Sequence, residues 1–556
     1  MLFWYTFFSL IVFSPILYVY GFGGFEAAKI TFFLITGSLM LIAFVKNKKN
    51  NNDSIIINRP LTTYSLIALA SYITVRSFFC EGLNLAWLGS YLTHLGSFVW
   101  LVFVLLIIAL INLRGNEKIK KTIILSAFIS LVAVLISVAL QHFGLMGGEW
   151  HIFDDPTRGR TLFGSIGSST YLGIVITMLT FISLPLIRAS NNIFRYLAIT
   201  VLAIATITVF LTKSITGIAI LVLGLALHLL KAPQYINKFI FISLFIIISI
   251  SPFVLLSPKM QSSLSSVAPS LVDRAYIWQS SIDSLDNSKT ILFGAGSEHF
   301  QFLYDQHFPQ ERIDLPSVTE EEPHNIILEI LTEWGLVGLL LFLTFSYYLL
   351  QESKLNKTAT LNLLLLWLLL QFNFLSANLL VISLILIKLA FEIKSQKSII
   401  LRTKLLLPLS ALIFVLSSVI GLGTIASSVA NHFGGVSSAK LDFNKSVSIF
   451  EQATKYSIFD KSFTLLQLAE ARANRAILNN DYSDYAQTEE ILLQALKGNP
   501  SARQYAIAIR IIEAYAAHDN NASRELSRTV NLFAKKWGSH PKHQDIIKSF
   551  KKVGWL

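Results

Sequence analysis

Long, continuous runs of apolar residues are the dominant feature of this sequence. Thirteen such runs lie at residues 2–20, 26–45, 61–79, 92–113, 121–140, 166–187, 196–212, 214–230, 239–257, 325–350, 358–372, 375–393 and 404–425. A helix that crosses a bilayer core of about 30 Å needs about 20 apolar residues, because each residue adds about 1.5 Å. The runs are continuous rather than alternating, which favours helices over a membrane barrel. We therefore predict an all-α fold, a polytopic membrane bundle of about 12–13 spans.

The composition excludes a soluble globular protein. Of the 556 residues, 53% are hydrophobic and only 14% are charged, whereas soluble domains carry about 25% charged residues. The formal net charge is +12, but the basic residues lie in short loops between apolar runs, which indicates membrane topology and no nucleic-acid partner. The single cysteine, Cys80, excludes an intrachain disulfide and a cysteine-cluster metal site, and we expect it to be buried.

Basic residues also predict the orientation of the bundle. They gather in alternate loops, at residues 46–59, 114–121, 188–195, 231–238, 354–357 and 394–404. The positive-inside rule places these loops and the N-terminus in the cytoplasm, and an odd number of spans then places the C-terminus outside. The first run has no small-residue cleavage site, so we expect a retained helix. The predicted organisation is spans 1–9 in residues 1–257, a large outer loop at 258–324, spans 10–13 in residues 325–425 and an outer tail at 426–556.

The tail has the pattern of a soluble helical domain. Alanine-rich, charged stretches such as residues 469–476 alternate with breaks at residues 479–481, 498–500 and 519–521. This spacing predicts antiparallel helix pairs of the tetratricopeptide-like kind, although the strict consensus of about 34 residues is absent. We interpret the tail as a scaffold or a docking module for an acceptor, with a second catalytic domain as the alternative.

The large outer loop contains a pair of side chains suited to binding. Arg274 and Trp278 are four residues apart and share one face of a helix. A guanidinium beside an indole makes a pocket for an anionic or carbohydrate group, and the alternative is an interfacial aromatic residue with a snorkelling arginine. The turn Gly294-Ala-Gly296 follows, and a lone Gly-x-Gly is weak evidence for phosphate binding.

The end of this loop places a histidine at the outer membrane surface. Pro323 precedes His324, so the next helix is expected to begin at or near His324. Glu329 and Glu333 follow on one face of that helix, and carboxylates entering a bilayer must point into a cavity or pair with a base. The alternative for His324 is a helix cap or a hydrogen-bonded surface group.

A short outer loop before the sixth run contains two arginines, Arg158 and Arg160, followed by glycines and hydroxyl residues up to Gly173. We expect exposed backbone amide groups at the start of this span and, with the arginines, an outward-facing anion site. The alternative is a loop with incidental positive charge.

Four short motifs together resemble a known family. They are Arg160-x-x-Phe-Gly-Ser-x-Gly167, Arg274-x-x-x-Trp278, Phe293-Gly-x-Gly296 and His324-Asn-x-x-Leu-x-x-x-x-Glu333-x-Gly-x-x-Gly338. They resemble the bacterial O-antigen ligase and polymerase superfamily, which includes protein O-oligosaccharyltransferases. The resemblance implies a multi-pass glycosyltransferase of the bacterial inner membrane with a periplasmic outer loop and tail. Such an enzyme transfers a glycan from undecaprenyl pyrophosphate to an acceptor hydroxyl, without a nucleotide sugar, cofactor or metal.

The resemblance also implies roles for individual residues. His324 would accept or orient the acceptor proton, and Arg160 and Arg274 would hold the donor pyrophosphate. Lys213 would contribute there too, because it stands where the family often has an arginine. Trp278, Asn325 and Glu333 would bind substrate or support the site.

Several functions remain open at this stage. The acceptor is a lipid core sugar, a protein serine or threonine, or the growing glycan itself, and the last would make the protein a polymerase. A lipid or solute transporter, or a non-catalytic assembly protein, is a further alternative. A transporter is disfavoured because the sequence has no paired half-repeats. In each case membrane lipids surround the chain.

Overall fold

The structure is a computed structural model of residues 1–556. It describes the chain apart from residues 19–23, 49–53, 58–59, 81, 91–92, 114, 146–152, 156–158, 189–190, 230–268, 309–319, 353–356, 374, 392–398, 403–405, 458–460, 480, 482–484, 499–501, 517–526, 538–547 and 549–556.

Helices account for almost all regular structure in the described residues. The bundle contains α1 (Leu2–Phe13), α2 (Gly24–Lys48), α3 (Pro60–Ser77), α4 (Leu83–Leu88), α5 (Ser97–Asn112), α6 (Glu117–His142), α7 (Ser169–Ser183), α8 (Asn192–Leu211), α9 (Ile215–Leu229), α15 (Ile326–Glu352), α16 (Lys357–Leu369), α17 (Ala377–Ala390) and α18 (Leu406–Ala439). Short 3-10 helices η1 (Ser14–Ile16), η3 (Gly164–Ile166) and η4 (Leu184–Arg188) extend or precede these. The outer loop contains α12 (Pro269–Asp283), α13 (Ser288–Phe293) and α14 (Phe300–Gln306), and the tail contains α19 (Phe443–Tyr456), α20 (Lys461–Asn479), α21 (Tyr485–Gly498), α22 (Ala502–Ala516) and α24 (Ser527–Trp537).

The helices bear out the prediction of a multi-pass membrane protein. Six are long and apolar enough to cross a membrane, namely Glu26–Asn47, Glu117–His142, Ser169–Arg188, Asn192–Leu211, Ile326–Gln351 and Leu406–Ala439. Shorter apolar helices match five more of the predicted runs, at Leu2–Ile16, Ser97–Asn112, Ile215–His228, Thr358–Leu369 and Ala377–Ala390. The ninth run, residues 239–257, lies outside the described residues. The total of thirteen spans therefore stays a prediction.

Polar caps fix where several helices begin. The side chain of Asn116 accepts a hydrogen bond from the Ile119 amide at 2.8 Å, at the start of α6. Asp442 does the same for α19, accepting from the Lys445 amide at 3.2 Å. Such caps satisfy amide groups that have no partner within the helix. Many Leu, Ile, Val and Phe side chains of the bundle helices pack in one large core, in which Phe33, Phe181 and Leu365 are fully buried.

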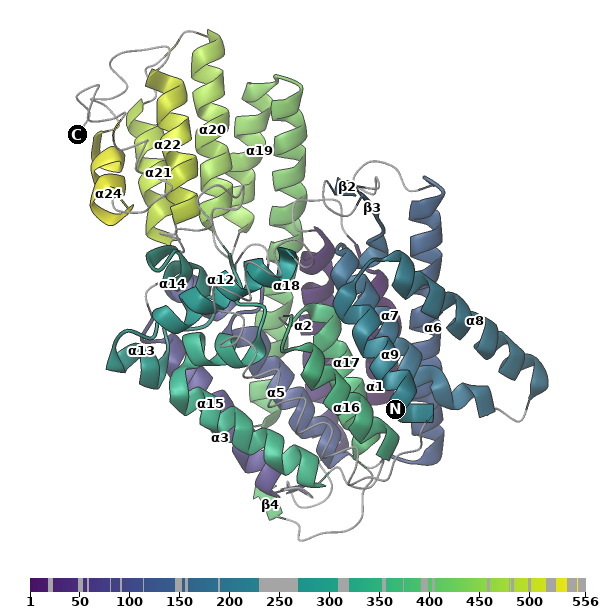
Figure 1. The fold of residues 1–556 in the computed structure, drawn as a ribbon. Helices are drawn as coiled ribbons and strands as arrows, with labels where there is room; N and C mark the ends of the chain where they lie inside the picture. Colours follow the sequence, from purple (N-terminus) through teal and green to yellow (C-terminus); the bar gives the residue numbers. More distant parts are fainter. Residues whose placement is uncertain are drawn as a thin grey trace.

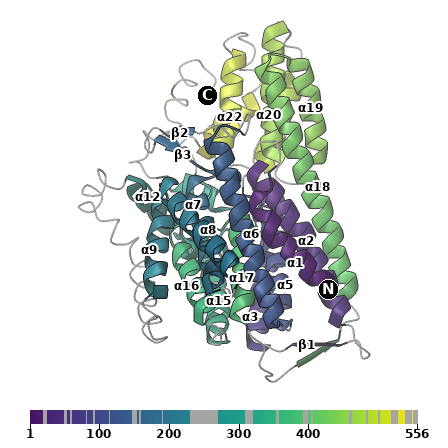
Figure 2. The ribbon, with the colours of Figure 1, turned by 90° about the vertical axis from the view of Figure 1, so that its right-hand side faces the viewer.

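Two small antiparallel sheets lie at opposite ends of the bundle (Figures 1 and 2). Strands β1 (Ser54–Ile57) and β4 (Ile399–Arg402) pair at the end far from the tail. Strands β2 (Phe153–Asp155) and β3 (Gly159–Thr161) pair at the end that carries the tail. The first pair joins two loops that we predicted to be cytoplasmic, and the second lies in a loop that we predicted to be outside.

The last span continues into the tail without a break. Helix α18 has 34 residues and passes through the predicted boundary at residues 425–426. Beyond the bundle it packs on the first tail helices, because Asn431 donates to the Thr464 hydroxyl at 2.9 Å and Ser446 donates to the Gly434 carbonyl at 2.9 Å. The tail is helical, as predicted, and it has its own apolar core of Leu466, Ala469, Leu492, Ala495, Ile509, Ile512 and Val530. The tetratricopeptide-like repeat stays a prediction.

Candidate functional site

Helix α15 is broken at Gly335, its tenth residue, which has φ 68° and ψ −171°. The break leaves carbonyl groups without helical partners, and the outer loop satisfies them. The amides of Ala295 and Gly296 donate to the carbonyls of Thr332 and Glu333, both at 2.8 Å. The hydroxyl of Tyr72 donates to the Trp334 carbonyl at 2.6 Å. The break is thus a specific junction between α15, α3 and the loop after α13.

Glycines allow the backbones to approach at this junction. A Cβ on Gly294 would clash with the backbone of Glu333, and a Cβ on Gly335 would clash with the backbone of Leu292. Arg76 reinforces the contact, because its Nε donates to the Phe293 carbonyl at 2.8 Å and its Nη2 donates to the Gly294 carbonyl at 2.6 Å. The amides of this Gly-x-Gly turn are therefore used within the protein, which argues against a phosphate cradle there.

Buried carboxyl groups surround the first part of α15. Glu298 accepts hydrogen bonds from the Thr93 hydroxyl at 2.6 Å and from the Leu95 amide at 3.0 Å. Its own amide donates to Oε1 of Glu333 at 2.7 Å. Glu322 and Glu329 are also buried, each with one carboxyl oxygen that has no hydrogen-bond partner within the described residues. We expected the carboxylates of α15 to point into a cavity or to pair with a base, and the structure places other carboxyl groups beside them.

Burial shifts the pKa values of Glu298 and Glu322, two carboxyl groups of the outer loop. Burial raises the pKa of Glu298 above its usual value, although hydrogen bonds from Thr93 and Leu95 oppose the shift. Burial raises the pKa of Glu322 well above its usual value, and the negative charges of Glu329 and Glu298 raise it further. Glu322, at the entrance of α15, therefore keeps its proton to a higher pH than a carboxyl group in water does.

Replacing Glu322 with glutamine is expected to stabilise the protein progressively as the pH rises. A raised carboxyl pKa contributes stability below the unfolded-state pKa of about 4.3, and this contribution is lost as the pH rises through the folded-state pKa. Glutamine keeps the shape and cannot ionise. The midpoint of thermal unfolding, measured in detergent from pH 5 to pH 9, should therefore be higher for Glu322→Gln than for the native chain. This difference should grow as the pH rises. The exposed Glu117 provides a control, Glu117→Gln, and a stability difference that does not change with pH would contradict the prediction.

His324 lies in a turn that is fixed on both sides. The indole Nε1 of Trp278 donates to the Pro323 carbonyl at 2.9 Å. On the other side, the Asn325 side chain accepts from the amides of Ile327 at 3.0 Å and Leu328 at 3.1 Å, which caps α15. His324 itself is half-buried. Trp278 is fully buried, so it supports the turn and has no free face on which a sugar can stack.

Strained backbone is concentrated around these residues. Five non-glycine residues in the described part of the chain have left-handed φ values, namely His94 (54°), Lys213 (55°), Glu298 (61°), His324 (52°) and Leu441 (63°). Each such residue costs about 1–2 kcal/mol, and this strain persists only where the surroundings hold it in place. Four of the five lie in loops at the tail-bearing end of the bundle, and only Leu441 belongs to the tail. Strain of this kind is typical of binding and catalytic sites.

Two of the predicted cationic residues, Lys213 and Arg160, lie outside the outer loop and α15. Lys213 is exposed and lies between α8 and α9, and the next residue, Ser214, donates to the Thr170 carbonyl at 3.2 Å. The following Tyr171 lies within electrostatic range of Arg274, Glu322 and Glu329. The start of α7 therefore connects the Lys213 loop with α12 and the His324 turn. Arg160 lies in β3 opposite Asp154, and its side chain is outside the described part of the chain.

The turn before α7, part of the expected anion site, has three backbone amides that are bonded within the protein. The amides of Phe163 and Gly164 donate to Oε1 of Gln141 at 3.0 and 2.9 Å, and the Ser165 amide donates to the Ser137 hydroxyl at 3.0 Å. The prediction that these amides are exposed is wrong, because polar side chains of α6 reach the turn and satisfy them. The turn is further held by Lys29, whose Nζ donates to the Ile166 carbonyl at 3.2 Å.

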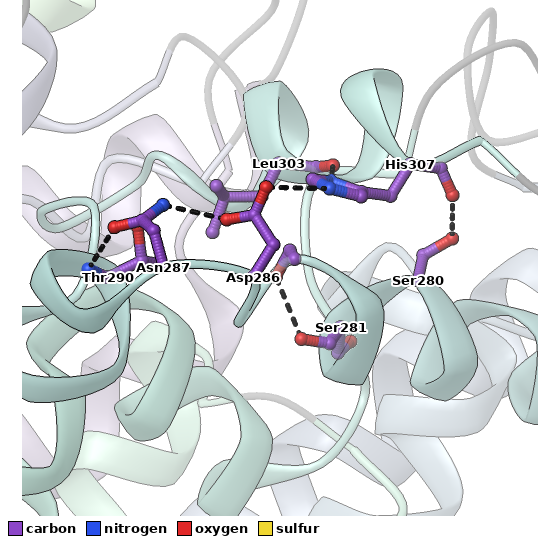
Figure 3. Close-up of polar contacts among 8 residues, drawn as sticks. Ser280, Ser281, Asp286, Asn287, Thr290, Leu303 and His307 are labelled. Carbon is purple, nitrogen blue, oxygen red and sulfur yellow. Dashed lines mark hydrogen bonds and ion pairs between the residues drawn. The ribbon is translucent and has the colours of Figure 1, made fainter.

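The outer loop that carries Arg274 and Trp278 is itself tied together by polar contacts (Figure 3). The hydroxyl of Ser280 on α12 donates to the His307 carbonyl at 2.6 Å. Nε2 of His307 lies 3.6 Å from Oδ2 of Asp286, in the turn between α12 and α13. Asn287 then caps α13 by accepting from the Thr290 amide at 2.9 Å. These contacts hold α12, α13 and α14 as one unit against α15.

Some of these residues were not predicted. Arg76, Thr93, Tyr171 and Glu298 hold the site together, and Lys29 lies deep in the bundle. The available signal was a charged residue within an apolar run, as at Arg76 and Lys29. Cys80 was expected to be buried, but it is half-buried because it follows the end of α3. In the described residues, His, Cys, Asp and Glu form no group of three or more suited to a metal ion, and the absence of a metal stays an expectation.

Together the fold and the site define a class of protein. It is a multi-pass helical membrane protein with a charged, strained site at the end of the bundle that carries a helical tail. Residues 198–343 match the family model described as O-antigen ligase, which supports membership of the O-antigen ligase superfamily. The matched segment includes Lys213, Arg274, His324 and Glu333 and leaves out Arg160. The family implies a glycosyltransferase-type enzyme. No curated protein matches the chain.

Proposed function

We propose that this protein transfers a glycan from undecaprenyl pyrophosphate to an acceptor hydroxyl at the periplasmic face of the bacterial inner membrane. The observation that carries the proposal is the His324 turn. It is held between the Trp278–Pro323 hydrogen bond and the Asn325 cap, and it lies in the segment that matches the O-antigen ligase family. An imidazole fixed in this way suits proton transfer near neutral pH, because its usual pKa is about 6.5.

The proposed reaction is a single displacement. The acceptor oxygen forms a bond to the anomeric carbon of the donor sugar, and the bond from that carbon to the pyrophosphate oxygen breaks. The acceptor proton passes to His324, and the negative charge that develops stays on the leaving pyrophosphate. Arg274 and Lys213, with Arg160, are proposed to stabilise that charge, because cations oriented in advance lower the barrier to such a step. Configuration at the anomeric carbon is inverted.

The acceptor defines three versions of this proposal. A lipid core sugar makes the protein an O-antigen ligase, a protein hydroxyl makes it an oligosaccharyltransferase, and the growing glycan makes it a polymerase. A transporter is less well supported, because the buried Lys388 donates to the carbonyls of Leu110 at 3.0 Å and Leu113 at 2.7 Å. This lysine is engaged with the backbone of a neighbouring helix rather than with an ion path.

The test is transfer of a labelled glycan from its undecaprenyl-pyrophosphate carrier by the purified full chain in detergent. Lipid core, a serine-rich protein and unlabelled glycan are offered as separate acceptors. The acceptor that receives label identifies the version of the reaction. Absence of transfer to all three would contradict the proposal.

Replacing Arg274 with alanine is expected to lower kcat by about 10²- to 10³-fold, the usual effect of removing one group that stabilises transition-state charge. Arg274→Lys should recover part of the rate, because lysine keeps the charge but not the planar fork of donors. Steady-state transfer kinetics measure both. The control is Arg195→Ala, which removes an arginine that lies over the Tyr196 ring near the start of α8. A change in KM alone for Arg274→Ala would contradict a role in the transition state.

A further inference from the structure

A large cavity lies where the tail meets the outer loop. Its volume is about 670 Å³, which is within the usual range for ligand pockets. The end of α3 contributes Phe79, the outer loop contributes Lys289 and Leu303, and the tail contributes Lys497 and Leu532. Three segments far apart in the sequence therefore form its walls.

The charge of this cavity has one sign. Lys289 on α13 and Lys497 on α21 both line it, and both are exposed. Among the described residues that line the cavity, none is Asp or Glu. The nearest acid in the sequence, Asp286, is engaged with His307 at 3.6 Å. The cavity is therefore complementary to a negatively charged group.

Exposed apolar residues lie along one edge of the cavity. Phe79 is 73% exposed directly after the end of α3. The outer loop lies against this end of α3, because the Arg76 side chain donates to the Phe293 carbonyl. The exposed apolar residues of these two segments are Val75, Phe78, Phe79, Leu83, Ile291, Leu292 and Phe293. An exposed apolar rim at the end of membrane helices is typical of contact with lipid.

We propose that this cavity binds the headgroup of an anionic phospholipid from the surrounding leaflet. The phosphate lies between Lys289 and Lys497, and the acyl chains leave past Phe79 into the bilayer. The bound lipid thereby joins the tail to the outer loop. A soluble anion would use the lysines but would leave the apolar rim without a partner, which is why the structure favours a lipid.

His324, Arg274 and Lys213, which we propose to act in the reaction, are not among the described residues that line this cavity. The turn Gly294–Gly296 forms part of the cavity wall through Gly294 and Ala295, while the amides of Ala295 and Gly296 are bonded to α15. Lipid binding can thus be measured without any glycan transfer. Failure of the proposed function would leave this proposal standing, and the converse also holds.

The test is binding of phosphatidylglycerol to the delipidated full chain in neutral detergent, measured by native mass spectrometry. A basic residue near an anionic lipid surface contributes about 1 kcal/mol, which corresponds to about a fivefold change in affinity. We therefore expect Lys289→Gln and Lys497→Gln each to weaken binding about fivefold, and the double variant about 30-fold. The control is Lys455→Gln on α19, an exposed lysine of the tail that does not line the cavity.

Two competitors distinguish the occupant. Phosphatidylcholine should compete poorly, because its headgroup has no net charge, and inorganic phosphate should compete only at far higher concentration. Equal binding of phosphatidylcholine, or full affinity in the double variant, would overturn the proposal. Displacement by inorganic phosphate as readily as by phosphatidylglycerol would overturn the lipid as occupant.

Discussion

Replacing His324 with asparagine is expected to lower glycan transfer by about 10²- to 10⁴-fold, the range that a general base contributes. Asparagine is the informative substitution because His324 has φ 52°, and asparagine adopts this left-handed backbone more readily than alanine. The variant therefore keeps the turn and removes the imidazole. Transfer is measured with the purified chain and labelled undecaprenyl-pyrophosphate glycan.

Two further variants separate the base from the turn. His324→Ala removes the imidazole and also strains the backbone, so it should be at least as inactive as His324→Asn. His142→Ala should keep near-native transfer, because His142 is exposed at the end of α6. Full activity in His324→Asn, with loss in His324→Ala, would mean that the turn matters and the imidazole does not.

Replacing Gly335 with alanine is expected to destabilise the protein by about 3 kcal/mol, the combined effect of backbone strain and overpacking. Its φ of 68° and ψ of −171° belong to a region that is almost exclusive to glycine. The added Cβ would also meet the backbone of Leu292 and Phe293, and backbone atoms cannot move aside as a flexible side chain can. The expected result is a large drop in the midpoint of thermal unfolding. Intrinsic fluorescence measures this midpoint, because Trp334 lies next to the break.

Gly435 provides the matched control for this substitution. It lies in α18, and a Cβ there would meet nothing within 4 Å. Alanine is a better helix former than glycine by about 1 kcal/mol, so Gly435→Ala should raise the unfolding midpoint slightly. If Gly335→Ala unfolds at the temperature of the native chain, the break in α15 is not a structural requirement.

The bundle was predictable because its signal is local. A continuous apolar run forms a helix in the membrane whatever the sequence on either side of it, and the described runs match helices in the structure. The end of the last span was not predictable in the same way. Helix α18 continues to Ala439 because its polar second half packs on α19 and α20, and a hydropathy boundary cannot detect that contact.

The site was predictable in part for the same reason. The Pro323-His324-Asn325 turn and the shared face of Arg274 and Trp278 follow from short-range rules. The remaining contacts join distant parts of the chain. Arg76 binds a carbonyl 218 residues away, and Thr93 binds a carboxyl 205 residues away. Whether a tryptophan faces solvent or supports a turn also depends on such contacts, so the full burial of Trp278 could not be read from its spacing.

The unbroken course of α18 makes the tail a rigid extension of the membrane bundle. A helix of 34 residues is about 50 Å long, and it turns by about 100° with each residue. The length of this helix therefore sets the distance of the tail from the membrane bundle, and its rotation sets the direction in which the tail faces. Whatever the tail binds is presented to the outer loop at a fixed distance and angle, and gaining or losing one residue in this helix would turn the tail to face another way.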